Sequence, residues 1–205
     1  MRELNKGLLI VISGPSASGK GTVNAHVLSD GRFEYSISAT TRAPRDYEED
    51  GREYHFIKKE AFETLIAEDG VLEYTVYCEN YYGTLRSFVD ERRAAGKHVI
   101  LEIEVDGAMQ VRKKHPDAVL IMLLPPSFKE QERRLRSRGT ETEEVIEKRL
   151  RQTKDEVPLF DRYDYVVYNE TGKALEAAED ILAIVRAETC RTTRNPNVAT
   201  DYFAD

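Results

Sequence analysis

Short, nearly continuous apolar runs alternate along the chain with longer charged segments. Such runs are typical of strands that are covered on both faces, as in a parallel sheet. They predict strands over Leu8–Ser13, His98–Glu104, Ala118–Leu124 and Asp164–Tyr168. Helices are predicted over Lys20–Ser29 and, from an apolar period of 3.6 residues, over Lys173–Glu188. Strands that alternate with helices indicate an α/β fold.

The stretch from about Ser38 to Phe88 breaks this rhythm. Tyrosine-rich segments in which apolar and polar residues alternate predict strands over Tyr54–Ile57, Val71–Cys78 and Tyr81–Tyr82, with a helix over Lys58–Asp69. Alternation of this kind is typical of antiparallel strands with one covered face. We therefore expect a small, mostly antiparallel unit inserted into the α/β core.

Two capping boxes follow, at Ser127–Glu130 and at Thr140–Glu143, and each predicts the start of a helix. A short turn near Arg138–Thr140 would separate the two helices. The final residues, Cys190–Asp205, carry no periodicity, and we expect them to form a loosely held tail.

The composition excludes several classes of protein. The 205 residues carry 30 Lys and Arg against 37 Asp and Glu, a formal net charge of −7, which argues against a dedicated nucleic-acid binder. The longest apolar run, Ala118–Leu124, is far shorter than the roughly 20 residues that cross a membrane, and the first apolar stretch is too short for a signal peptide. Two cysteines, Cys78 and Cys190, are too few for a disulfide scaffold, and no Cys/His cluster suggests zinc. A cytoplasmic enzyme or binding domain remains.

A glycine-rich turn joins the first predicted strand to the first predicted helix. Gly14, Gly19 and Lys20 match G-x-x-x-x-G-K, the beginning of the phosphate-loop pattern. Glycines let successive backbone N–H groups turn toward one centre, the helix adds its positive end, and the lysine reaches the outer phosphates. The pattern predicts a nucleotide-phosphate site, and a ligand-free strand-to-helix turn is the alternative.

The position after the lysine departs from the general pattern. It is Gly21, where the pattern has Ser or Thr, and the hydroxyl follows one place later at Thr22. This shift weakens the expectation that a side chain here binds Mg²⁺ directly.

Five motifs occur in order from about Lys6 to about Glu188. They read G-P-S-A-S-G-K-G-T at 14–22, S-A-T-T-R-A-P-R at 38–45, N-Y-Y-G-T at 80–84, L-E-I-E-V-D-G-A at 101–108 and R-G-T-E-T at 138–142. Together they resemble a bacterial guanylate kinase. The resemblance implies transfer of the γ-phosphate of ATP to GMP, giving ADP and GDP, with Mg²⁺ brought in by ATP. That reaction recycles nucleotides and supplies precursors of GTP.

The resemblance also implies a fold in three parts, with a P-loop NTPase-like parallel sheet flanked by helices as its core. We place the core at residues 1–37, 89–126 and 156–189, the GMP-binding subdomain at 38–88, a mobile helical lid at 127–155 and the tail at 190–205. The sequence does not specify an oligomeric state.

The resemblance places ATP on the phosphate loop and the lid. The implied ATP-binding residues are Gly14, Pro15, Ser16, Ala17, Ser18, Gly19, Lys20, Gly21, Thr22, Arg138, Arg149 and Asn169. Lys20, Arg42, Arg138 and Arg149 would be the catalytic residues, because positive charge around the equatorial oxygens lowers the barrier to phosphoryl transfer. For Asn169, a strand-ending turn residue is the alternative. The other lid arginines, Arg134, Arg136 and Arg151, are expected on solvated helix faces.

The residues expected to bind GMP are Ser38, Arg42, Arg45, Tyr54, Glu73, Tyr82, Thr84 and Glu104. Arg42 and Arg45 are the only charges in 38–45, and arginine forks match phosphate oxygens; a solvated arginine pair is the alternative. A carboxylate such as Glu73 can accept guanine N1–H and the exocyclic amine together, whereas adenine has no N1–H. The residues alone would favour an exposed strand position for Glu73, and the resemblance favours guanine recognition.

Three positions depart from the usual family pattern. Ala17 replaces a glycine in the loop, and its methyl group leads us to expect weakened ATP affinity at a working site. Glu104 replaces an aspartate, and Asp106 replaces a glutamine. Glu102 and Glu104, expected at the end of one strand, could therefore hold the GMP site or organise Mg²⁺.

Two rival functions share some of these residues. Another nucleoside monophosphate kinase, acting on AMP, UMP or dTMP, is disfavoured by Glu73 and Thr84. A guanylate-kinase-like module that binds peptides without catalysis is disfavoured because the loop glycines, Lys20 and the two lid arginines are all present.

Overall fold

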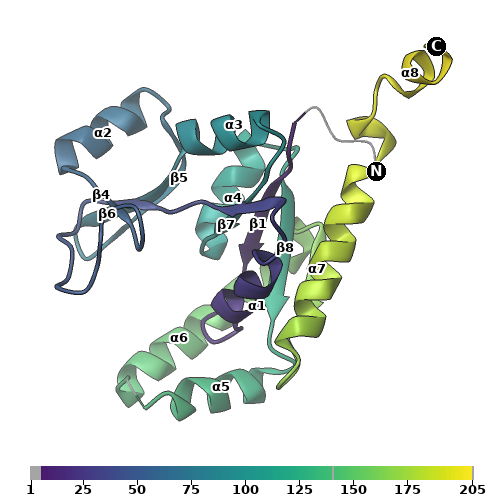
Figure 1. Ribbon diagram of the computed structural model, residues 1–205. Coiled ribbons are helices and arrows are strands. Elements are labelled where there is room, and N and C mark those ends of the chain that lie inside the picture. Colours follow the sequence, from purple (N-terminus) through teal and green to yellow (C-terminus); the bar gives the residue numbers. More distant parts are fainter. Residues whose placement is uncertain (1–5, 140, 205) are drawn as a thin grey trace.

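The computed structural model describes residues 6–139 and 141–204, which form an α/β core with two appendages (Figure 1). The core sheet has the strand order β2-β7-β1-β8-β9, with bounds Phe33–Tyr35, His98–Glu102, Leu9–Ser13, Val119–Leu124 and Tyr165–Tyr168. Every neighbouring pair of strands in this sheet is parallel. The parallel sheet predicted from the apolar runs is confirmed.

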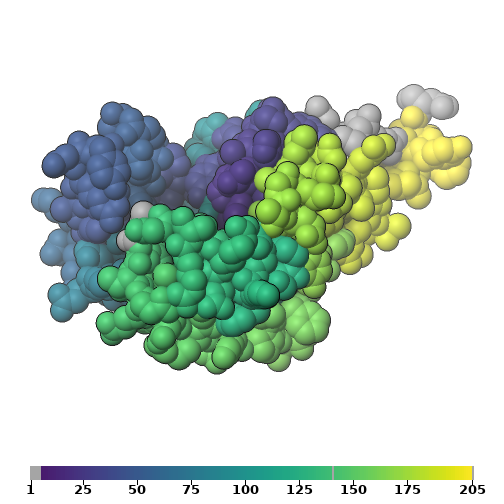
Figure 2. Space-filling model, turned by 90° about the horizontal axis from the view of Figure 1, so that it is seen from below, coloured from purple at the N-terminus to yellow at the C-terminus, as the bar shows by residue number. Residues whose placement is uncertain are grey.

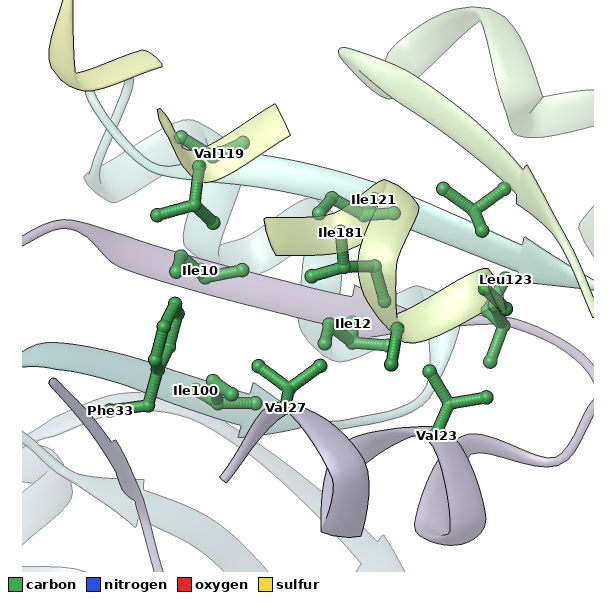
Figure 3. Close-up of a cluster of buried hydrophobic side chains, with 14 of the residues drawn as sticks. Ile10, Ile12, Val23, Val27, Phe33, Ile100, Val119, Ile121, Leu123 and Ile181 are labelled. Carbon is green, nitrogen blue, oxygen red and sulfur yellow. The ribbon is translucent and has the colours of Figure 1, made fainter. Parts of the chain in front are cut away.

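Helices cover both faces of the core sheet. They are α1 (Lys20–Val27) and α7 (Ala174–Thr189) on one face, and α3 (Arg86–Ala94) and α4 (Val105–Lys114) on the other. On the first face Ile12 of β1 packs with Val23 and Ile181 (Figure 3), and on the second Val11 packs with Val111. Burial of such a side chain contributes about 1.5–3 kcal/mol. The central strand is therefore firmly held where it enters the phosphate loop.

The inserted unit is a second sheet with the strand order β4-β3-β6-β5. Its strands are His55–Phe56, Ala39–Thr40, Asn80–Leu85 and Val71–Tyr77, and helix α2 spans Lys59–Ala67. Only the short β3–β4 pair is parallel, so the mostly antiparallel unit predicted here is confirmed. Phe62 of α2 is fully buried against Ala39 and Val71, which gives the unit its own apolar core. In Figure 2 the unit stands as a separate lobe beside the lid.

The segment that we expect to form the lid, and call the lid below, contains α5 (Phe128–Ser137) and α6 (Glu143–Glu156) and is followed by a 3₁₀ helix over Val157–Arg162. Ser127 Oγ accepts a hydrogen bond from the Glu130 N–H at 3.1 Å, which confirms the first capping position. The second predicted start was too early, because Thr142 is the N-cap of α6. Thr140, the predicted cap, lies outside the described residues.

Three further details differ from the sequence-based expectations. Strand β7 stops at Glu102 and Glu104 is the N-cap of α4, because the buried Val105 already begins that helix. Strands β2 and β3 were not predicted. Helix α3 runs across the limit that we expected between residues 88 and 89. The division of the chain into a core and a GMP-binding subdomain stays a prediction.

The tail is held more firmly than its lack of periodicity predicts. Arg191 and Arg194 donate hydrogen bonds to Glu188, whose side chain is 2 % exposed, and a 3₁₀ turn spans Thr192–Arg194. Only beyond this anchor does helix α8 (Val198–Phe203) project away from the body (Figure 1). None of the helices in the described ranges combines the length and apolarity needed to cross a membrane.

Candidate active site

The phosphate loop leaves the carboxyl end of β1 and enters α1 directly. Gly19, the N-cap of α1, has a φ of 91°, a left-handed conformation that favours glycine. At Gly14 a Cβ atom would come within 2.1 Å of the Leu123 carbonyl oxygen, so only glycine fits beside β8. Gly21 and Thr22 lie exposed in the first turn of α1. The loop has the shape that its sequence predicts.

Lys20 folds back over this loop. Its Nζ donates hydrogen bonds to the carbonyl oxygens of Gly14 at 2.6 Å and Pro15 at 3.3 Å. Burial lowers the pKa of the ammonium, and the nearby carboxylates of Glu102 and Glu156 oppose that shift. The lysine is therefore already held at the centre of the loop.

Asn169 braces the loop from the end of β9. Its Nδ2 donates to the Ser18 carbonyl oxygen at 2.8 Å, and the Asn169 side chain is buried. Arg134 of the lid donates to the Asn169 carbonyl oxygen at 2.8 Å, and its side chain is only 17 % exposed. The expectation of a solvated Arg134 was therefore wrong, whereas Arg136 and Arg151 are exposed as expected.

The lid meets the loop at Ser16. Arg149 Nη1 donates to Ser16 Oγ at 2.8 Å, and Gln131 Nε2 donates to the Ser16 carbonyl oxygen at 3.0 Å. Arg149 also pairs with Glu141 at 3.0 Å. Arg138 ends α5 at the surface, close enough for its charge to lower the pKa of Lys20. Of the two lid arginines, Arg149 contacts the loop directly and Arg138 is exposed.

Ala17 of the phosphate loop has a φ of 62°, and its methyl group is buried against the lid helices. It packs in one apolar cluster with Leu135, Ile146 and Leu150. The methyl group that departs from the family pattern therefore joins the loop to the lid helices.

A cavity of about 470 Å³ lies between the inserted unit and the core. The predicted residues that line it are Lys20, Ser38, Tyr54, Glu73, Tyr82, Glu102, Glu104 and Asp106. The inserted unit contributes the tyrosines and Glu73, β7 contributes Glu102, and the N-terminal end of α4 contributes Glu104 and Asp106. Residues far apart in the chain thus share one cavity that reaches from the loop lysine to Glu73.

Glu73 is buried at the far end of this cavity, with 4 % of its surface exposed. Thr84 Oγ1 donates a hydrogen bond to Glu73 Oε1 at 2.7 Å. Burial raises the pKa of the Glu73 carboxyl, and the Thr84 hydrogen bond opposes the rise. The exposed strand position that the residues alone favoured for Glu73 was wrong.

The two predicted phosphate arginines are placed differently. Arg42 forms two hydrogen bonds with the Glu48 carboxylate, each of 2.9 Å. Its guanidinium carbon lies 5.6 Å from the centre of the Tyr54 ring, and the centres of the Tyr54 and Tyr82 rings are 5.8 Å apart. Arg45 has 61 % of its side chain exposed and donates to the Tyr47 hydroxyl. Neither arginine lines the cavity in this structure: Arg42 packs behind Tyr54, which does line it, and Arg45 is largely exposed.

Acidic side chains surround the loop lysine. Glu102 accepts a hydrogen bond from Asn24 Nδ2 at 2.7 Å, and Glu104 and Glu156 both act electrostatically on Lys20. Carboxylate oxygens are ligands that Mg²⁺ prefers, so Glu102 and Glu104 have the chemistry to help hold such an ion. No group of three or more His, Cys, Asp or Glu side chains placed to hold a metal occurs within residues 6–139 and 141–204.

Sequence reasoning missed Gln131, which joins the lid to the loop. Besides Ser16, its Nε2 contacts the Thr153 hydroxyl of α6 at 2.7 Å. A glutamine in a helix of charged residues carries no signal of burial, so only the packed structure reveals it.

The comparisons with known proteins agree on one family. The sequence model described as guanylate kinase matches residues 6–185. A guanylate kinase of Bacillus anthracis is 50 % identical over 191 residues, which cover 92 % of each chain. A guanylate kinase of Latilactobacillus sakei is 47 % identical over 192 residues, 93 % of this chain and 94 % of the relative.

The fold agrees as well. The crystal structure of guanylate kinase from Anaplasma phagocytophilum has a TM-score of 0.74 to this chain at 27 % identity, and the match covers 99 % of both chains. The phosphate loop, the lid that contacts it and the cavity that ends at Glu73 occupy the matched region. On these grounds the chain belongs to the guanylate kinase family.

Proposed function

We propose that the cavity between Lys20 and Glu73 is where the γ-phosphoryl group of ATP passes to GMP, giving ADP and GDP. The activity follows from family membership, and the roles of the individual residues are our proposal. The observation that supports them best is that the phosphate-loop lysine and a buried carboxylate suited to guanine line the same cavity.

Glu73 would select the base. Thr84 occupies one side of Oε1, and the remaining lone pairs of the carboxylate can accept N1–H and the exocyclic amine of guanine. An adenine ring offers no N1–H and would leave the buried carboxylate unmatched, which is costly. Ser38, Tyr54 and Tyr82, from the same unit, would hold the rest of GMP, with Arg42 and Arg45 on its phosphate.

ATP would lie along the phosphate loop, residues 14–22, with Asn169 near its base. Lys20, Arg138 and Arg149 would surround the transferring group, while an oxygen of the GMP phosphate bonds to the γ-phosphorus and the bond to the ADP oxygen breaks. That oxygen is already anionic, so the reaction requires no general base. Catalysis is then positioning and stabilisation of charge.

The chemistry that Mg²⁺ would supply, brought in with ATP, is positive charge that offsets the charge of the phosphates. Glu102 and Glu104 are the groups of this chain that would hold the ion, and Thr22 is not assigned that role because its hydroxyl comes one place later than in the general pattern. Their carboxylates would also keep Lys20 charged against the effect of its burial.

The test is an acceptor panel with ATP and Mg²⁺ in which GMP, AMP, UMP and dTMP are compared. We expect turnover with GMP alone, and equal turnover of AMP and GMP would overturn the assignment. Lys20→Ala should lower kcat about 100- to 1,000-fold, because it removes a charge that stabilises the transition state. Glu73→Gln should instead raise the KM for GMP at least about tenfold, because one lost hydrogen bond to a charged group accounts for that factor. Lys113→Ala, an exposed position on α4, is the control and should match the parent.

A further inference from the structure

Gln110 of α4 is hydrogen-bonded to the backbone of β5 in the inserted sheet. Its Oε1 accepts from the Tyr74 N–H at 3.2 Å, and its Nε2 donates to the Tyr74 carbonyl oxygen at 2.9 Å. A side-chain amide offers the same donor and acceptor as a peptide group. Gln110 thus takes the place of a neighbouring strand for the one residue that follows Glu73.

Strand β5 needs such a partner because it is the outer strand of its sheet. The order β4-β3-β6-β5 leaves the far side of β5 without a strand, so half of its backbone groups face away from β6. Tyr74 lies opposite Gly83 of β6 in the register, and its own N–H and C=O point away from β6, to Gln110. Helix α4 belongs to the core, so these bonds connect the inserted unit to the core.

The register of β5 is irregular at Glu73. Val71 lies opposite Leu85 and Tyr74 opposite Gly83, so Leu72 and Glu73 together face the single residue Thr84. Such a bulge turns a side chain away from the direction that strand alternation would give it. Leu72 enters the apolar core beneath the main sheet, and Glu73 is buried at the end of the cavity.

The carboxylate itself has little room to move. Thr84 holds Oε1, and a Cβ on Gly107 of α4 would come within 2.8 Å of Oε2. Gly107 and Gln110 lie on the same helix, one turn apart. Helix α4 therefore fixes the position of the β5 backbone at Tyr74, through Gln110. Through Gly107 it also leaves the space that the Glu73 carboxylate occupies.

We infer that Gln110 is a positioning residue for base selection, which fixes the backbone after the bulge so that the Glu73 carboxylate meets both hydrogen-bond donors of guanine. The inference rests on the proposed role of Glu73. Gln110 is not among the described residues that line the cavity, and it acts through Tyr74 and the bulge.

The test separates positioning from simple stabilisation. Gln110→Leu keeps the size of the side chain and removes both bonds, whereas Gln110→Glu keeps the oxygen that accepts from Tyr74 and loses the donor. The readouts are the KM for GMP, the KM for ATP and the inhibition constant of IMP against GMP. IMP keeps N1–H and lacks the exocyclic amine, so it makes only one of the two bonds to Glu73.

We expect Gln110→Leu to raise the KM for GMP about tenfold and Gln110→Glu about threefold, on the scale of one hydrogen bond, with the KM for ATP within about twofold of the parent. IMP binding should weaken less than GMP binding, so the preference for GMP over IMP should shrink. Lys113→Ala, on the same helix, should leave all three values unchanged.

Two outcomes would overturn the inference. One is an unchanged KM for GMP in the folded variants, with folding checked by thermal unfolding. The other is an equal loss of GMP, IMP and ATP binding, which indicates only a weakened structure. If Gln110→Leu does not fold, Gln110→Glu decides by the same readouts.

Glu73→Gln, measured alongside, separates this inference from the proposed function. If Glu73→Gln retains the parent preference for GMP over IMP, the role of Glu73 is wrong. If it loses the preference while both Gln110 variants keep it, only the role of Gln110 is wrong.

Discussion

Thr84→Val removes the side-chain hydrogen bond from Thr84 to Glu73 without changing the shape of the Thr84 side chain. Thr84 is 1 % exposed and Glu73 is 4 % exposed, so solvent cannot replace the lost donor in the folded state. A hydrogen bond to a charged group contributes about 1.5–3 kcal/mol. We therefore expect the free energy of unfolding to fall by about 2 kcal/mol at pH 8, on the scale of that bond.

This loss should depend on pH in a defined direction. Burial raises the pKa of folded Glu73 above its ordinary value of 4.5, so its contribution to stability is largest below pH 4.5 and is lost as the pH rises through the folded pKa. The Thr84 hydrogen bond opposes this rise, so Glu73 has a higher folded pKa in the variant than in the parent. The variant therefore loses more stability than the parent as the pH rises. The difference between the two proteins should grow from a small value at pH 4.5 to its full size at pH 8.

Urea unfolding of the parent and the variant at both pH values measures this difference. Thr84→Ser, which keeps the hydroxyl, is the matched control and should lose less at pH 8. A difference between Thr84→Val and the parent that is the same at pH 4.5 and pH 8 would refute the reasoning, because the lost bond would then not act on a carboxylate.

Three other substitutions test the lid, the loop and the tail. Ala17→Gly removes the strain of an alanine in the left-handed conformation and also removes a buried methyl group, two opposite effects of about 1 kcal/mol each. Urea unfolding should therefore show a net change in the free energy of unfolding below about 1 kcal/mol. Amide exchange in α6 should become faster, because the helix loses the contact with the methyl group. Arg134→Leu removes the lid's bond to the Asn169 carbonyl and should raise the KM for ATP several-fold, with the KM for GMP unchanged. Glu188→Gln weakens the partner of both tail arginines, so limited proteolysis should cut within residues 190–204 faster than in the parent, and an unchanged rate would contradict the anchor.

The core of the fold was predictable because its signals are local. The apolar runs predicted the four long strands of the parallel sheet, and the Gly14–Lys20 spacing predicted the phosphate loop. Strands β2 and β3, of three and two residues, were missed because their pairing with β7 and β6 forms them. Short segments of this kind carry too few residues for any periodicity.

In the candidate site, too, the residues that belong to local motifs were predictable and those that depend on distant contacts were not. Lys20 and Glu73 could be named from motifs, and the structure places both in one cavity. Gln110 and Gln131 could not, because a glutamine in a helix gives no sign of whether its amide faces water or another backbone. Their partners, Tyr74 and Ser16, lie far away in the sequence, and only the packing of helices on the sheet and loop brings them together.

The two hydrogen bonds from Lys20 to Gly14 and Pro15 have a consequence for the thermodynamics of nucleotide binding. Fixing the backbone of one residue costs about 1–2 kcal/mol in conformational entropy. In this chain the two hydrogen bonds of Lys20 already order the backbone of the phosphate loop in the folded protein. The conformational entropy of the loop is therefore lost before a nucleotide binds. The contacts with phosphate can then contribute to affinity without ordering the loop first.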